Sequence, residues 1–335
     1  MENNHDHIRL TASEVGKLWG SYLNDTLGIC TISYFLKDVE DPDIREVLEY
    51  ASDLSKRHIE IIANIFKEEK FPIPVGFIDQ DVNLNAARLF TDEFMLYYIQ
   101  NMGMMGINSY SIALPSSARI DIREFYTNCM QSSLELFNRA SNVLQEKGLF
   151  IRAPYIPYPI QAEFVHKRHF MAGWLGKQRP LTTIEICFLF DNLYRNSLGS
   201  ALLTGFSQVA QSNEVRSYMV RGAEIAKHHS AVFSKFLSED NIPTPMSWSL
   251  APLTSKEPVF SDKLLMFHTT ALNNAGMGYY GASMGESARK DLFAAYTRLS
   301  VEVAEFAGDG ANIMIDNGWL EKPPSAPDRQ NLGKG

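Results

Sequence analysis

The sequence predicts an all-α protein built from two copies of one four-helix unit. The copies are related by a period of about 170 residues, so that Leu10-Thr11 recurs as Leu181-Thr182 and His58 recurs as His229. Within each copy, apolar residues recur at the three- and four-residue spacing of amphipathic helices. No alternating pattern typical of strands interrupts these apolar stripes.

Local signals mark where the helices start. A capping box, Thr11-x-x-Glu14, precedes the first helix, and Thr182-x-x-Glu185 repeats it in the second copy. The second helix is expected to open at Asp41-Pro42, because an aspartate cap followed by proline suits a helix N-terminus. The third and fourth helices are expected to begin near Thr91 and Ser117 in the first copy, with Gly148 after the last turn, and near Ser261 and Ser287 in the second.

The connections between helices predict the topology. Short loops near residues 38–41 and 114–116 imply antiparallel neighbours. A long segment, 71–90, joins the second helix to the third, and 242–260 does the same in the second copy. A single long crossover is typical of ferritin-like folds, so we predict two tandem ferritin-like four-helix bundles. The bundles are expected over residues 8–150 and 181–321, with a linker over 151–180 that contains a short helix from 161 to 174, and a mobile tail over 322–335.

Composition narrows the class of protein. The 335 residues carry a formal net charge of −8, which argues against nucleic acid or an anionic membrane surface as a partner. The N-terminus is polar, unlike a signal peptide, and no apolar run has the length of a membrane span. Cys30, Cys129 and Cys187 fall at non-equivalent positions of the repeat, which indicates reduced thiols. We therefore expect a soluble protein of the cytoplasm.

A ferritin-like bundle can hold a di-metal carboxylate centre between its helices. Such a centre needs a glutamate from each of two helices and a Glu-x-x-His motif from each of the other two. Neither His58 nor His229 has a glutamate three residues before it. Glu135 and Glu305 are equivalent in the two copies, but both lie opposite the apolar stripe of the fourth helix and are expected in solvent.

The sequence accordingly predicts no catalytic residue, no cofactor and no di-metal site. The alternative is a single divalent ion of the zinc or nickel type, with His229, His268 and Glu302 as ligands. Inward positions at mid-bundle height otherwise carry groups that can hydrogen-bond to one another. These predicted core polar residues are Thr26, His58, Tyr98 and Ser133 in the first copy, and Ser197, His229 and His268 in the second.

Other motifs have structural interpretations. Gly106 and Gly276, inside the third helices, indicate close approach to a neighbouring helix, with a hinge or a ligand contact as the alternative. Glu163-x-x-His166-x-x-His169 is interpreted as ordinary linker, because its spacing spreads three side chains around a helix. Two arginine–aspartate pairs are expected to be local and structural: Arg119 with Asp121, and Arg289 with Asp291.

Four long runs of the chain are similar to those of a known family. They are Gly173-Trp174 through Arg179-Pro180-Leu181, Ala201-Leu-Leu-x-Gly-Phe-Ser207, Phe260-Ser-Asp-Lys-Leu-Leu-Met-Phe-His-Thr-Thr270 and Asp309-Gly-Ala-Asn-Ile-Met-Ile-Asp-Asn-Gly-Trp-Leu320. On these runs the chain resembles a domain-of-unknown-function family of spore-forming bacteria, whose members are often labelled spore coat proteins. The resemblance implies a tandem pair of ferritin-like bundles and implies no activity.

Three functional hypotheses follow. The first is a non-enzymatic structural or interaction protein of a sporulating bacterium, located in the cytoplasm or the spore coat. Its partners would be other spore or coat proteins, or a second copy of the chain. The second hypothesis is a ferritin-like oxidoreductase or storage protein that binds metal in the second bundle. The third is a small-molecule binding module, with a ligand among the aromatic and methionine side chains of a third helix.

Overall fold

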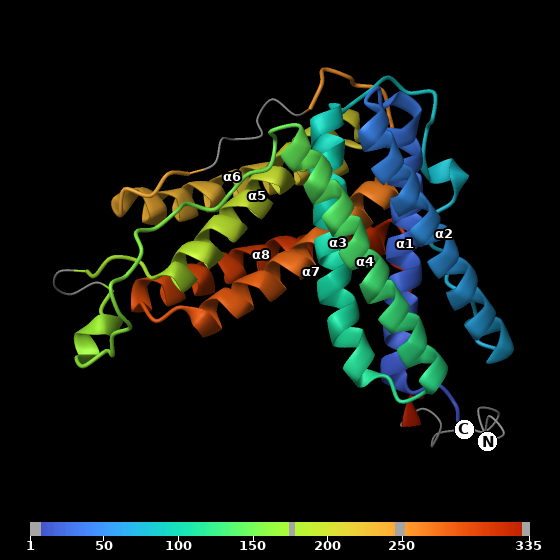
Figure 1. Cartoon of the computed structure of the whole chain (residues 1–335). Coiled ribbons are helices and arrows are strands. Elements are labelled where there is room, and N and C mark those ends of the chain that lie inside the picture. Colours follow the sequence, from blue (N-terminus) through green and yellow to red (C-terminus); the bar gives the residue numbers. More distant parts are fainter. Residues whose placement is uncertain (1–7, 174–177, 245–251, 330–335) are drawn as a thin grey trace.

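The computed structural model describes residues 8–173, 178–244 and 252–329, which form eight α-helices and no β-strand (Figure 1). The predicted all-α class is therefore confirmed. None of the helices in these residues is long and apolar enough to cross a membrane. The helices of the first half are α1 (Ala12–Asp38), α2 (Pro42–Glu68), α3 (Asp92–Ala113) and α4 (Ile120–Glu146); those of the second are α5 (Thr183–Val209), α6 (Asn213–Glu239), α7 (Asp262–Glu286) and α8 (Lys290–Asp316).

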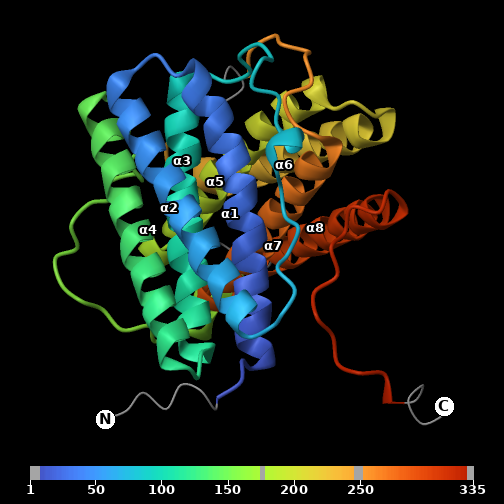
Figure 2. The ribbon, with the colours of Figure 1, turned by 90° about the vertical axis from the view of Figure 1, so that its right-hand side faces the viewer.

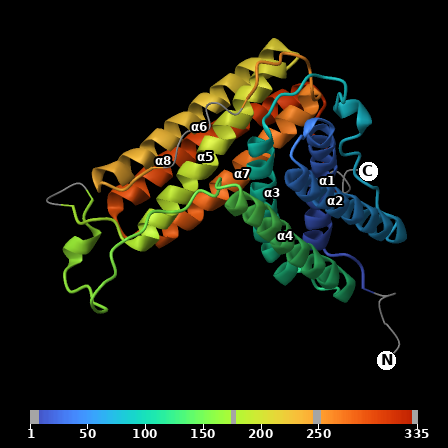
Figure 3. The ribbon, with the colours of Figure 1, turned by 45° about the horizontal axis from the view of Figure 1, so that its top comes forward.

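Each half is assembled from pairs of helices. In the first half α1 packs along α2 and α3 packs along α4, and α2 also contacts both α3 and α4. In the second half α5 and α8 each contact α6 and α7, so the four helices close a ring. Figure 2 shows residues 71–90 running back along α1 to the end of the half where α3 begins. Figures 1 and 3 show that the long axes of the two halves cross rather than run parallel.

The two halves meet through equivalent residues, as the subunits of a symmetric dimer do. Two isolated antiparallel bridges join the crossover segments, Val82 with Phe260 and Phe90 with Pro252. Each residue of one bridge lies 170 positions from a residue of the other. The backbone hydrogen bonds beside them repeat the relation: Asn83 N–H donates to Val259 O at 2.7 Å, and Leu253 N–H donates to Leu89 O at 2.7 Å. The halves are thus related by an approximate two-fold axis.

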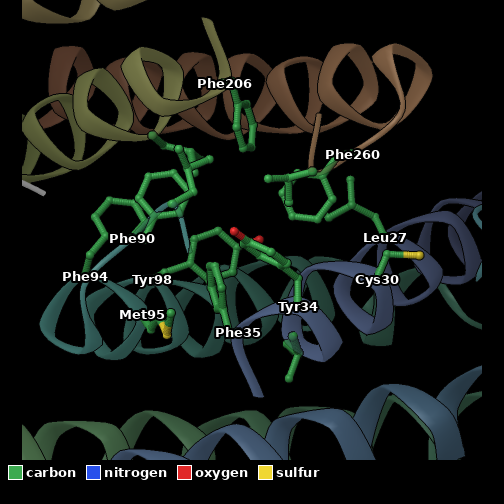
Figure 4. Packing of buried hydrophobic residues seen from close by; sticks show 14 of the residues in the cluster. Leu27, Cys30, Tyr34, Phe35, Phe90, Phe94, Met95, Tyr98, Phe206 and Phe260 are labelled. Atoms are coloured by element: carbon green, nitrogen blue, oxygen red, sulfur yellow. The ribbon is translucent and has the colours of Figure 1, made fainter. Parts of the chain in front are cut away.

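Aromatic side chains fill this junction, which we define as the contact of α1, α3 and segment 81–90 with α5, α7 and segment 252–261 (Figure 4). The Phe35 ring lies 5.3 Å from Tyr98, and the equivalent Phe206 ring lies 5.2 Å from His268. A Cβ atom on Gly205 would lie 2.6 Å from the Phe90 ring, so only glycine admits that ring. The buried cluster at the junction draws residues from both halves, while each half keeps a smaller cluster at its far end.

Both predicted capping boxes are present. The Glu14 N–H donates to Thr11 Oγ1 at 3.2 Å, and Thr11 N–H donates to the Glu14 carboxylate at 2.7 Å; Thr182 and Glu185 repeat the arrangement. The starts of α4 and α8 were expected near Ser117 and Ser287, but the helices begin three residues later. The reason is that both serine hydroxyls donate backwards, to Ala113 O and Ser283 O, and do not cap the helices.

The fourth helices receive their caps from the first helices instead. The second oxygen of the Glu14 carboxylate accepts the N–H groups of Ala118 and Arg119 at 2.9 and 2.8 Å. In the second half Glu185 accepts the Arg289 N–H at 3.1 Å and two hydrogen bonds from the Arg179 guanidinium at 2.7 and 2.8 Å. One buried carboxylate per half therefore ties two helix N-termini together, where the negative charge also complements both helix dipoles.

The helical part of the linker is shorter than expected. Between 161 and 173 the only helical element is a 3-10 turn, Arg168–Met171, and residue 174 lies outside the described residues. Tyr155, Tyr158 and Phe164 extend into solvent, so this segment lacks the packing that would stabilise a longer helix. At the other end of the chain, the Glu321 carboxylate accepts the N–H groups of Val75 and Gly76 at 2.8 and 3.1 Å, which holds the residues after α8 against the first half.

The Glu185 cap predicts a dependence of stability on pH. Burial alone raises the pKa of Glu185, but the hydrogen bonds from Arg179, Thr182 and Arg289 outweigh burial and lower the pKa from 4.5 to about 2. The carboxylate therefore stabilises the folded state fully above about pH 4.5, by on the order of 3 kcal/mol, and this contribution is lost as the pH falls towards 2. Urea unfolding at several pH values should show the stability difference between wild type and Glu185→Gln shrinking over this window. Glu305→Gln, an exposed change in the same half, should show no such trend, and a parallel pH dependence of all three proteins would contradict the assignment.

Candidate functional site

The predicted polar core of the first half centres on a pair of buried side chains. His58 Nδ1 lies 3.4 Å from Asp25 Oδ1, and both side chains are buried. The rings of Tyr110 and Phe125 flank the imidazole, each at 5.9 Å. His58 was predicted as a core polar residue, but Asp25 was not, although it is a carboxylate within an apolar helical stripe. Thr26, next to it, accepts the Phe77 N–H at 3.2 Å and thus anchors the crossover.

The second half carries a longer hydrogen-bonded chain at the equivalent height. His229 is fully buried; its Nδ1 lies 2.9 Å from the Tyr280 hydroxyl, and its Nε2 lies 2.9 Å from Glu302 Oε2. The Tyr280 hydroxyl in turn lies 2.9 Å from Asn196 Nδ2 and 3.1 Å from Asn196 Oδ1. Burial lowers the pKa of His229 and outweighs the opposing effect of Glu302, so the imidazole is neutral near pH 7. Both ring nitrogens have partners within the protein.

His268 belongs to the junction and not to this chain. Its Nε2 lies 3.1 Å from the hydroxyl of Tyr98, the residue at the equivalent position of the first half. Complete burial lowers the pKa of His268 to about 3, so this imidazole is also neutral. The candidate metal ligands are therefore separated: Glu302 contacts His229, while His268 contacts Tyr98. Among the described residues, no three His, Cys, Asp or Glu side chains gather as a metal site would require.

A cavity of about 110 Å³ adjoins the His229 chain. It lies among α5, α6, α7 and α8, and α3 of the first half borders it at the junction. Asn196, His229 and Tyr280 form one polar part of its wall, and Arg195, Asn273 and Tyr279 form another. Apolar side chains supply the rest, including Leu202, Leu203, Ile225, Leu272 and Phe306. A mostly apolar wall with few convergent polar groups is typical of small-molecule sites.

Glycines explain why the halves differ here. A Cβ atom on Gly103 would lie 3.0 Å from the Phe137 backbone nitrogen, and one on Gly106 would lie 2.4 Å from Ser133 Oγ, so α3 touches α4 closely. Asn273 stands at the position equivalent to Gly103, and a Cβ atom on Gly276 would meet no atom within 4 Å among the described residues. The prediction of close helix approach is thus confirmed for Gly106 and wrong for Gly276, which lines the cavity.

The remaining predicted residues have simple environments. Glu135 and Glu305 are exposed, as expected. The guanidinium groups of the two predicted pairs, Arg119 with Asp121 and Arg289 with Asp291, donate to their aspartates through Nε and Nη2. Ser133 is buried, but Ser197 is only half-buried and lies 3.4 Å from the Ser230 hydroxyl. Glu163, His166 and His169 are exposed in the linker, and the three cysteines form no disulfide in the described residues.

Fold and cavity together define a class: an all-α protein of two repeated halves with a ligand-sized cavity in the second. Comparison with known families agrees with the repeat. The chain belongs to the family described as "Protein of unknown function (DUF3231)", whose family model matches residues 1–161 and 169–332. The family resemblance expected from the sequence is thereby confirmed.

The crystal structure of a "putative spore coat protein" from Bacillus halodurans C-125 is similar to this chain at 16% sequence identity and a TM-score of 0.41. The similarity covers 48% of this chain and 100% of that chain. A search of curated proteins finds no match.

Proposed function

We propose that the protein is a non-enzymatic binding and interaction protein whose second half holds a small organic molecule. The observation that carries the proposal is the cavity beside His229, which combines an apolar wall with fixed polar groups. His229 itself serves as part of the wall, because both of its ring nitrogens are engaged by Tyr280 and Glu302. A neutral imidazole with two partners holds neighbouring side chains in place and does not act on a ligand as a general base.

The proposal includes a ferritin-like arrangement of each half. Two closely paired helices, a long crossover and a second pair follow one another in both halves, in support of this assignment. At the height where ferritin-like proteins hold metal, this chain has Asp25 with His58 in one half and Asn196 with His229 in the other. His58 is engaged by Asp25 Oδ1, and Tyr280 joins Asn196 to His229, so we propose that the scaffold works without a resident metal or cofactor.

Association with the spore is proposed from the family resemblance. In this proposal the protein is located in the cytoplasm or the spore coat of a sporulating bacterium, and other coat proteins or a second copy are its partners. A fluorescent fusion expressed from the native promoter should mark the developing spore, while the fluorescent protein alone should remain diffuse. A fusion that stays diffuse through sporulation, or that is absent from purified spores, would contradict the association.

The absence of a resident metal is tested by elemental analysis of protein purified without chelators. We expect well under one metal ion per chain, because His229 has no free nitrogen and His268 lies elsewhere. His229→Ala should leave the metal content unchanged while lowering stability by on the order of 2 kcal/mol through its two lost hydrogen bonds. His228→Ala, at the exposed neighbouring position, should change neither quantity. Stoichiometric metal that disappears with His229→Ala would establish the alternative function.

Native mass spectrometry of protein purified from its own host tests the cavity. Wild-type protein should carry a small molecule that is released under denaturing conditions. Gly276→Leu should lose it, because Gly276 lines the cavity and a Cβ atom there meets no atom within 4 Å, which leaves room for a side chain that competes with the ligand for space. Gly278→Leu is the matched control: it lies two residues along the same helix, exposed and outside the cavity wall. The cavity would be excluded as the site if the wild type carried nothing or if both variants retained the molecule.

A further inference from the structure

The cavity wall contains buried donors that lack acceptors. Within the part of the chain that the structure describes, the Nε–H of Arg195 donates to no acceptor, and the Nδ2–H of Asn273 faces the Tyr218 hydroxyl without making a hydrogen bond of ordinary length. Both residues line the cavity, Arg195 from α5 and Asn273 from α7. A buried donor without a partner costs free energy that a suitable acceptor recovers. The wall therefore favours a ligand that brings oxygen acceptors.

Arg195 is held in place but poorly satisfied. Its guanidinium stacks on the Tyr279 ring, with Cζ 3.8 Å from the ring centroid, and its Nη2 donates to the Met104 sulfur at 3.3 Å, a weak acceptor. The carboxylate of Asp191 lies 3.7 Å from Nη2, beyond hydrogen-bonding distance, and is nearly half exposed. Stacking fixes the plane of the guanidinium and leaves its edge available for an anion.

The repeat shows that these groups are particular to the second half. The positions equivalent to Arg195, Asn273 and Tyr279 carry Asn24, Gly103 and Ser109 in the first half. Arg195, Tyr279 and Asn273 thus occur together in the second half. The same half has the cavity beside the hydrogen-bonded chain of His229. Arg195 and Asn273 are not needed to build the fold, since the first half forms the same helices without them.

We infer that the ligand is a small monocarboxylate, whose carboxylate accepts from Arg195 and Asn273 and whose hydrocarbon part fills the apolar wall. This inference rests on the proposed function and specifies its ligand. A single formal positive charge, partly offset by Asp191, suits a monoanion better than a phosphate, which carries more charge and seeks more donors. The volume of about 110 Å³ sets the size, since a cavity of about 150 Å³ accommodates benzene. A branched chain of four or five carbons fits this volume.

Ligand-observed NMR titration with a defined series of probes tests the inference. Acetate, propionate, butyrate and isovalerate should bind with affinities that rise by about fourfold for each buried methylene until the cavity is full. Isovaleramide, the neutral analogue of isovalerate, should bind at least tenfold more weakly because it lacks the charge that Arg195 recognises.

Variants assign this preference to Arg195. Arg195→Met keeps an apolar stem against Tyr279 and should weaken isovalerate at least tenfold while leaving isovaleramide within about twofold. Retained amide binding shows that the cavity of this variant is intact. Arg221→Met removes another arginine stacked on aromatic rings in the same half, outside the cavity wall, and should change neither affinity.

The results of these titrations test the class of ligand and the location of the binding site separately. The carboxylate inference is overturned if isovalerate and isovaleramide bind equally well, or if Arg195→Met leaves the affinity for isovalerate unchanged. In either case the cavity remains the binding site if Gly276→Leu abolishes binding. If binding survives Gly276→Leu, the cavity is not the site and both proposals fail. The absence of detectable binding by every acid of the series overturns the inference as well.

Discussion

The junction between the halves is the constraint on which the rest of the structure depends. Equivalent residues face each other across it: Tyr98 contacts His268, and the bridges of Val82 with Phe260 and Phe90 with Pro252 exchange places under the 170-residue repeat. A large part of the buried apolar surface lies in this shared cluster. Because burial of apolar area is the main driving force of folding, the halves stabilise each other much as the subunits of a dimer do. The junction also brings α3 to the edge of the second half, where it completes the cavity wall.

Symmetry at the junction contrasts with divergence inside the halves. Glu14 and Glu185 tie together the same helix ends, and His58 and His229 occupy the same height. Around these fixed points the halves differ: Gly103 lets α3 approach α4 closely in the first half, and Asn273 stands at that position in the second. A duplicated scaffold permits such divergence, because one copy can maintain packing while the other takes on a different role. The cavity and Arg195 belong to the second half.

Some features followed from local patterns and others did not. The capping boxes and the exposed positions of Glu135 and Glu305 were predicted, since each depends on spacing along one helix. The late starts of α4 and α8 were missed, because their caps come from carboxylates about 104 residues away in the sequence. At the site, His229 and Glu302 were named but Arg195, Asn196, Asn273 and Tyr280 were not. Comparison of the two copies singles out Arg195 and Asn273, which stand where the first copy has Asn24 and Gly103. It does not single out Tyr280, whose equivalent is Tyr110, and Asn196 stands where the first copy has Asp25.

The sequence by itself determined the helical class, the twofold repeat and the membership of a family, because periodicity and internal similarity are properties of the chain order. Tertiary structure alone decided which equivalent residues meet at the junction and which histidines contact a carboxylate. It also decided which glycine allows two helices to pack closely and which one lines a cavity. Gly106 and Gly276 are the same residue at the same position of the repeat, yet their surroundings are opposite. The physical reason is that packing depends on the side chains of neighbouring helices, whose distance and orientation no pattern within one helix specifies.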